Sequence, residues 1–217
     1  MDPYSSYIED LSFGIPFQLS CIDPEQLLAS TLAQARQWIE SELVARRVYV
    51  DSSADIHHSV TMEGPIYVGA RVQVGPGAHL RPFTVLGDDC VVGHGAEIKG
   101  SVCLGGSKMQ SNSFSGDSLL GQGARVASGV VLANRRFDQQ PVKSGSPARL
   151  SESAFLGCLL GDFARIGANA ICAPGTMIGR HTWIGGLVHA YGVIEPNKLI
   201  MLRQDWDISD KPPLKLS

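Results

Sequence analysis

The chain has 217 residues, a formal net charge of −3, 24 glycines and only 7% aromatic residues. This length suits one domain with a full core, and the charge argues against a polyanionic partner such as nucleic acid. No apolar run approaches the roughly 18 residues that a membrane helix needs, and the polar first ten residues do not resemble a signal peptide, so a cytoplasmic protein is expected.

Residues 1–49 form an N-terminal segment in which the sequence predicts a helix over 23–47. Asp23 is a suitable cap, and Pro24 suits the first helical position. Apolar residues follow at helical spacing: Leu27, Leu28, Thr31, Ala35, Trp38, Ile39 and Leu43. This apolar face needs a partner, which we expect to be the first coil of the domain that follows or a neighbouring subunit.

From residue 50 to 200 large residues recur every six positions. They are Val50, Ile56, Met62, Val68, Val74, Leu80, Leu86, Val92, Ile98 and Leu104, then Leu120, Val126 and Leu132, then Leu160, Ile166, Cys172, Ile178 and Ile184. A small inward candidate stands two places before most of them, for example Val102 before Leu104. A period of six predicts a parallel β-helix of hexapeptide repeats, an all-β solenoid in which three short strands make each coil.

Two stretches interrupt the period, and the sequence ends in an aperiodic segment. The first stretch, 105–119, and the second, 133–159, are predicted to be loops that leave the scaffold, where binding sites are often built. Residues 201–217 are predicted to form a C-terminal tail.

Charged residues line up on one predicted outer face. Arg81 and Lys99 are 18 residues apart, which is one coil, so they are expected to stack about one strand spacing apart. His79 and Glu97 have the same separation beside them, and Glu63 lies 18 residues before Arg81. The column is either a seat for an anion or phosphate, with His79 oriented by Glu97 as a base, or a solvated ladder of charges.

Neither the cysteines nor the histidines form a metal-binding pattern. The five cysteines are never spaced CxxC, and Cys90 and Cys172 fall at inward positions, which favours buried free thiols. The six histidines do not suggest the three-histidine zinc site of a β-helical carbonic anhydrase, so no metal is expected.

Several short motifs carry a family resemblance over about residues 50–200. His79–Thr84, Ala96–Lys99, Gly106–Lys108 and Ser115–Asp117 resemble the acetyltransferase domain of bifunctional N-acetylglucosamine-1-phosphate uridyltransferases. Val92–Gly95, Leu132–Asn134, Pro174–Thr176 and Ile178–Arg180 are still more similar to the C-terminal domain of sugar-1-phosphate nucleotidyltransferase-like proteins. The resemblance implies a left-handed β-helix and a homotrimer. The segment before residue 50 is too short for a nucleotidyltransferase domain, so pyrophosphorylase activity is not expected of this chain alone.

The resemblance also implies an activity: transfer of an acetyl group from acetyl-CoA to a sugar phosphate or nucleotide sugar. It assigns the sugar phosphate to Arg81 and Lys99 and matches Lys108 to the lysine of a Gly-Ser-Lys motif. Lys108, Ser111 and Asn112 are predicted to be further substrate contacts. The small residues Ala168, Ala170 and Gly175 would let the pantetheine of CoA approach between subunits.

One position departs from the family pattern. The family places its catalytic histidine three residues after the lysine of the Gly-Ser-Lys motif and a tyrosine three residues later, where this sequence has Ser111 and Phe114. Arg125 stands where an asparagine is expected. General-base catalysis is typically worth about two to four powers of ten in rate, and a serine hydroxyl cannot replace it.

Two functions therefore remain open. If the base has been relocated, His79 oriented by Glu97 is the first candidate and His94 the second. Otherwise the chain is a non-catalytic trimeric binding or assembly module that partners a separate nucleotidyltransferase.

Overall fold

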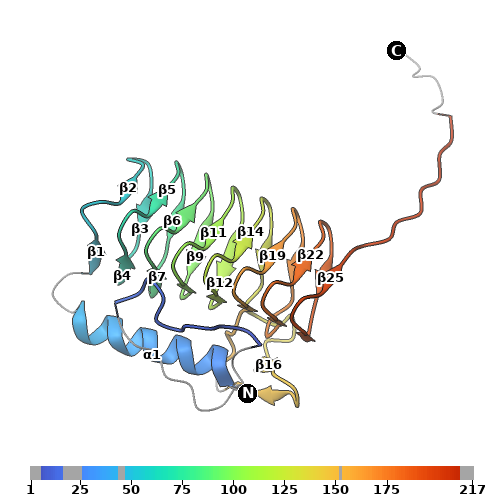
Figure 1. Cartoon of the computed structure of the whole chain (residues 1–217), viewed down its shortest axis with the longest axis horizontal. Helices are drawn as coiled ribbons and strands as arrows, with labels where there is room; N and C mark the ends of the chain where they lie inside the picture. Colours follow the sequence, from blue (N-terminus) through green and yellow to red (C-terminus); the bar gives the residue numbers. More distant parts are fainter. Residues whose placement is uncertain (1–5, 17–25, 44–46, 152, 211–217) are drawn as a thin grey trace.

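The computed structural model describes residues 6–16, 26–43, 47–151 and 153–210. The chain winds into a parallel β-solenoid of about eight turns with one helix beside it (Figure 1), which confirms the predicted fold class and is consistent with a left-handed β-helix. No helix in the described part of the chain is long and apolar enough to cross a membrane.

Three parallel sheets form the sides of the solenoid, and we name them A, B and C. Sheet A contains β1 (Val48–Val50), β4 (Ile66–Val68), β7 (Thr84–Leu86), β10 (Val102–Cys103), β13 (Leu119–Leu120), β18 (Leu159–Leu160), β21 (Met177–Ile178) and β24 (Val193–Ile194). Sheet B contains β2 (Asp55–Ile56), β5 (Gln73–Val74), β8 (Val91–Val92), β11 (Lys108–Met109), β14 (Arg125–Val126), β19 (Arg165–Ile166), β22 (Trp183–Ile184) and β25 (Leu199–Ile200). Sheet C contains β3 (Thr61–Met62), β6 (His79–Leu80), β9 (Glu97–Lys99), β12 (Phe114–Gly116), β15 (Val131–Leu132), β20 (Ile171–Cys172) and β23 (His189–Ala190).

The core is the stack of inward side chains that the six-residue period predicts. Leu80, Val92, Leu120, Ile166 and Ile178 are among its fully or almost fully buried members. Because each coil hydrogen-bonds only to the coils before and after it, this stack holds the solenoid together along its length.

The stretch 105–119 is not a loop, which corrects the prediction. It contains β11 and β12, each in register with its neighbours, and ends in β13. Cys103, rather than Leu104, pairs with Leu86 and points inward, so Ile98 and Cys103 are five residues apart instead of six. Leu104 and Val102, predicted to face inward, belong to a second apolar cluster outside the solenoid.

The second interrupted stretch, residues 133–159, does leave the solenoid. Between β15 and β18 the chain forms an antiparallel hairpin, β16 (Lys143–Ser144) with β17 (Arg149–Leu150), which we call the excursion hairpin. Its base is buried: Val142 and Leu156 are almost fully buried in the second apolar cluster. After β25, residues 201–210 have no regular secondary structure and extend away from the last coil (Figure 1).

The helix α1 (Leu27–Glu42) is shorter than predicted and lies elsewhere than on the first coil. It runs along the outer face of sheet A (Figure 1), where Leu28 and Ile39 pack with Val85, Val102 and Leu119 in the second apolar cluster. The predicted cap Asp23, together with 24, 25 and 44–46, lies outside the described residues.

Residues 6–16 cross the corners between sheets A and B. The Asp162 amide donates to the Tyr7 carbonyl at 2.7 Å, and the Asp88 amide donates to the Gly14 carbonyl at 2.7 Å. This segment and α1 together cover sheet A, so sheets B and C keep the outer faces on which a site can be built.

Candidate functional site

The charged residues predicted to share one outer face do lie together on sheet C, but their side-chain contacts differ from those expected. His79 lies opposite Glu97 in the strand register, yet its Nε2 atom contacts Glu63 Oε1 at 2.8 Å. Glu97 Oε1 instead accepts a hydrogen bond from Arg81 Nη1 at 2.8 Å. The predicted His79–Glu97 pair is therefore wrong: long side chains on adjacent strands reach diagonal neighbours 16 residues away, not only the residue directly opposite.

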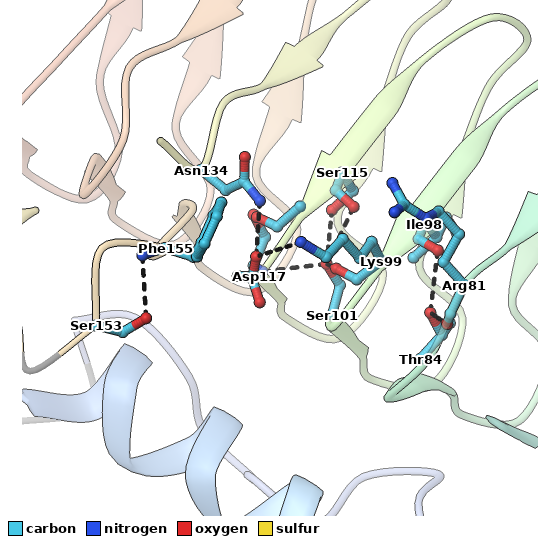
Figure 2. A network of polar contacts seen from close by, with 12 residues as sticks. Arg81, Thr84, Ile98, Lys99, Ser101, Ser115, Asp117, Asn134, Ser153 and Phe155 are labelled. Atoms are coloured by element: carbon cyan, nitrogen blue, oxygen red, sulfur yellow. Dashed lines mark hydrogen bonds and ion pairs between the residues drawn. The ribbon is translucent and has the colours of Figure 1, made fainter. Parts of the chain in front are cut away.

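Lys99 is drawn toward a buried carboxylate rather than toward Arg81 (Figure 2). Its Nζ atom lies 4.0 Å from Asp117 Oδ2 and 4.6 Å from the ring centroid of Phe155. Asn134 Nδ2 donates to the same Asp117 oxygen at 2.7 Å, and Asp117 is only 1% exposed. Both cations of the predicted anion seat thus have a carboxylate neighbour.

The position of the family's catalytic histidine lies at a corner between sheets B and C. The Asn112 amide donates to the His94 carbonyl at 2.8 Å, so Ser111 and Asn112 sit one coil after His94 on the same corner. The His94 ring turns toward the preceding coil, where its Nδ1 atom lies 2.8 Å from the Pro76 carbonyl oxygen. The corner therefore brings the backbone of His94, but not its ring, to Asn112.

Lys108 belongs to a different face. It lies on the outer side of sheet B, paired in register with Arg125, which is paired in turn with Arg165. Trp183 follows on the next strand, with the Arg165 guanidinium carbon 5.2 Å from its ring centroid. All four side chains are exposed.

A shallow groove opens beside this row, toward the last coils. It has a volume of about 260 Å³ and is lined by Arg125, Ala127, Arg165, Ile166, Gly167, Trp183, Ile184, Gly185, Leu199 and Met201. The row and groove were missed because the excursion hairpin puts Arg125 and Arg165 forty residues apart in the sequence, which hides their pairing. A search that allowed for one long insertion in the repeat would have found it.

The three residues expected to contact CoA lie in different environments. Ala168 is exposed on the corner beside Gly167. Ala170 points into the core and is fully buried. Gly175, at φ +79°, lies beneath the excursion hairpin, where an added Cβ would clash with the Lys143 carbonyl oxygen. Of the three, only Ala168 is open to a ligand, because core packing and the hairpin occupy the other two positions.

A second cavity of about 430 Å³ lies between α1 and the excursion hairpin. Arg36, Asp117, Ser144, Arg149 and Phe155 are among its lining residues. The hydroxyl of Ser144 is buried and has no hydrogen-bond partner among the residues that the structure describes.

The thiols and possible metal ligands add no reactive group. Cys90, Cys103, Cys158 and Cys172 are free and buried, as the repeat predicted for two of them, and burial raises the pKa of the Cys90 thiol to about 11. Cys21 lies outside the described residues. Within the described ranges no three His, Cys, Asp or Glu side chains are grouped to hold a metal ion.

The stacked hexads define the chain as a hexapeptide-repeat β-helix. Within that class, residues 62–157 match the family described as the GMPPB C-terminal domain, which confirms the resemblance to sugar-1-phosphate nucleotidyltransferase-like proteins.

Curated relatives show the same resemblance. The chain is 33% identical over 132 residues to the bifunctional protein GlmU of Methanocaldococcus jannaschii, covering 60% of this chain and 32% of that protein. It is 34% identical over 184 residues to a bifunctional sugar-1-phosphate nucleotidylyltransferase/acetyltransferase of Sulfurisphaera tokodaii, covering 83% of this chain and 45% of that protein. The chain therefore spans less than half the length of these two relatives.

Solved structures resemble the chain more distantly. A perosamine N-acetyltransferase mutant of Caulobacter crescentus, in complex with CoA and GDP-perosamine, is 19% identical with a TM-score of 0.38, covering 66% of this chain and 52% of that one. An N-acyltransferase mutant of Bacillus cereus, AntD, in complex with dTDP-4-amino-4,6-dideoxyglucose and CoA, is 16% identical with a TM-score of 0.37, covering 76% and 86%.

Proposed function

We propose that the chain is an acyltransferase-type β-helix that transfers an acetyl group from acetyl-CoA to the amine of a sugar phosphate or nucleotide sugar. One observation carries the proposal: a histidine–carboxylate pair, His79 with Glu63, stands beside Arg81 and Lys99 on the outer face of sheet C. The names of the relatives, which include bifunctional nucleotidylyltransferase/acetyltransferases, support the same class of reaction.

The His79–Glu63 contact selects a tautomer of the imidazole. An ionised carboxylate can only accept, so Nε2 of His79 carries the proton that it donates to Glu63 at 2.8 Å. The lone pair of the neutral ring is then on Nδ1, for which no partner exists in the described part of the chain. A substrate amine that reached Nδ1 could give up its proton there while its nitrogen formed the bond to the acetyl carbon. The thioester C–S bond would then break, and CoA would leave as a thiol that takes the proton back from the imidazole. Glu63 takes the orienting role that was predicted for Glu97.

Arg81 and Lys99 would hold the phosphate of the acceptor. Each would have to exchange part of its contact with Glu97 or Asp117 for the ligand, so phosphate binding is expected to be moderate rather than tight. Bound acetyl-CoA would supply an activated thioester. The exposed corner at Ala168 and the neighbouring groove, whose lining includes Arg125 and Arg165, would be the place where acetyl-CoA approaches.

His94 remains the second candidate for the base. The Pro76 carbonyl can only accept, so Nδ1 of His94 carries a proton and Nε2 is the basic atom. Its ring faces the coil before the Ser111 corner, which makes His79 the better choice.

A non-catalytic assembly module is the second candidate function, and a specific observation favours it. The two cations of the predicted phosphate seat already have carboxylate neighbours, as expected for a solvated charge ladder. In that function the β-helix would trimerise and hold a separate nucleotidyltransferase chain.

A thiol-release assay with acetyl-CoA and glucosamine 1-phosphate or amino-sugar nucleotides separates the two functions. The acyltransferase predicts slow but measurable transfer, abolished by His79→Ala and reduced at least about tenfold by Glu63→Gln, which disturbs the tautomer. His57→Ala is the matched control, because the His57 side chain is exposed and hydrogen-bonds locally to Ser59, two residues further along the chain. No transfer to any acceptor, by a folded protein that forms trimers, would favour the assembly module.

A further inference from the structure

Three cations stand side by side on the outer face of sheet B. Lys108 on β11 pairs in register with Arg125 on β14, and Arg125 pairs with Arg165 on β19. Adjacent strands are about 4.8 Å apart, so each cation is one strand spacing from the next. Like charges this close repel one another unless an anion neutralises them.

Other cations on the outer faces of the solenoid have carboxylate neighbours within the chain. Arg71 contacts Asp89, Arg81 contacts Glu97, and Lys99 lies near Asp117. By contrast, no carboxylate of the described residues forms an ion pair with Lys108, Arg125 or Arg165. The three cations on sheet B are therefore exposed and have no carboxylate to neutralise them among the described residues. The predicted phosphate site at Arg81 and Lys99 on sheet C, by contrast, already has carboxylate neighbours.

The row ends at an aromatic ring and beside an opening. Trp183, 51% exposed, lies next to Arg165 in the register and continues the row onto β22. The groove of about 260 Å³ beside them is lined by Arg125, Arg165 and Trp183. Phosphates prefer arginine and lysine, and nucleobases stack on exposed aromatic rings.

We propose that the outer face of sheet B is a seat for a nucleoside 5′-diphosphate group. The phosphates would lie on Arg125 and Arg165 with Lys108 at the far end, and the base would stack on Trp183. From Lys108 to Trp183 is three strand spacings, or about 14 Å, roughly the length of an extended nucleoside diphosphate. Nucleotide sugars and CoA both carry such a group, so the inference deepens the proposed function and rests on it for the choice between these two sources.

Two other occupants fit less well. The row holds only three cations on a chain of net charge −3, which is too little positive charge for a nucleic-acid strand. Carboxylates of a second copy could neutralise the row, but they would leave Trp183 and the groove unexplained.

Calorimetric titration of the full chain with ADP, UDP, GDP and pyrophosphate, at about 50 and 200 mM salt, tests the seat. We expect the nucleotides to bind, with affinity that falls as salt rises. The double variant Arg125→Gln/Arg165→Gln should weaken them at least about thirtyfold, as expected for two lost charged hydrogen bonds. Arg71→Gln is the matched control, an exposed arginine that is paired with Asp89, and should bind like the parent.

The contributions of the nucleobase and of the phosphates to binding can be measured separately. Trp183→Ala should weaken the nucleotides about tenfold and leave pyrophosphate unchanged, because only the stacking contact is lost. Comparing CoA with UDP- and GDP-sugars then distinguishes the sources: the natural ligand should bind more tightly than its nucleoside diphosphate alone.

Three results would overturn the seat: no nucleotide binding at millimolar concentration, equal binding by parent and double variant, or a double variant that changes oligomer mass without changing nucleotide affinity. The test is independent of catalysis. If no acetyl transfer is found but ADP binds and the double variant loses it, the proposed function fails and the seat stands. His79→Ala should keep normal nucleotide binding in either case.

Discussion

Arg36 on α1 and Asp117 on a corner of the solenoid, 81 positions apart in the sequence, lie with Nη2 and Oδ1 only 2.5 Å apart. Asp117 is almost fully buried and also accepts from Asn134, which stands at the start of the excursion hairpin segment. This carboxylate therefore ties together the helix, the sheet C row through Lys99, and the excursion.

Removing one partner of this carboxylate should destabilise the fold. Arg36→Ala is expected to lower the free energy of unfolding by about 1–2 kcal/mol, less than a fully buried pair would lose, because the Arg36 side chain is 44% exposed. Urea denaturation followed by circular dichroism measures it. Arg71→Ala removes an exposed pair and should shift the midpoint little. Equal midpoints for Arg36→Ala and the parent would show that the contact adds no stability.

The proposed phosphate site on sheet C can be tested by removing one of its cations and by removing a carboxylate that competes with the phosphate. Lys99→Ala should weaken binding of glucosamine 1-phosphate by about 1–3 kcal/mol, the scale of a charged hydrogen bond. Glu97→Gln should strengthen it, because Arg81 would lose its competing carboxylate. Calorimetry measures both. If both variants are folded and bind with unchanged affinity, these charged residues form a solvated charge ladder and not a phosphate site.

Restoring the family's histidine should raise acetyl transfer. We expect Ser111→His to increase the rate on glucosamine 1-phosphate by about tenfold or more, if the acceptor site is otherwise intact. Ser128→His, one coil further along the same corner, is the matched control, because Gly129 and Ser111 are hydrogen-bonded neighbours there. An equal rise in both variants would indicate adventitious base catalysis rather than a restored site.

The chain is expected to form a homotrimer through its exposed apolar side chains. Val131 and Ile171, 36% and 46% exposed, are adjacent on the outer face of sheet C, and the nearby corner adds Tyr191 at 74%. Light scattering should give three times the subunit mass of 23.2 kDa, and Ile171→Lys should lower it. Phe137→Lys, on the excursion, should leave the mass unchanged. A single-subunit mass for the parent would contradict this prediction.

Alkaline pH should destabilise the chain through its core thiols. Burial raises the pKa of Cys90 from 9.0 to about 11, so between these values the folded state keeps a proton that the unfolded state releases. Stability is therefore lost as pH rises from 9 toward 11. Cys90→Ala should reduce that slope by at most about 1.4 kcal/mol per pH unit, the value for one proton. Urea midpoints at pH 8, 9 and 10, in a Cys21→Ser background, measure the slope, and identical slopes would exclude this cause.

The sequence by itself determined the solenoid, because inward positions such as Leu80, Leu86 and Val92 must stack coil on coil, and only a β-helix satisfies a six-residue period over so many repeats. It also predicted the excursion, since nothing between Leu132 and Leu160 continues the period. The sequence could not predict the shortened corner between Ile98 and Cys103. Both Cys103 and Leu104 are apolar, and a one-residue step exchanges inward and outward faces.

Only the tertiary structure decided the side-chain partners. His79 contacts Glu63 and Arg81 contacts Glu97 because side-chain reach across neighbouring strands, not strand register, selects the carboxylate that each side chain meets. Only the structure shows that Lys108, Arg125 and Arg165 are neighbours on sheet B, because the excursion interrupts the repeat between Arg125 and Arg165. The position of α1 depended on which outer face offered an apolar surface, and that was sheet A, where the register change at Cys103 turns Val102 and Leu104 outward.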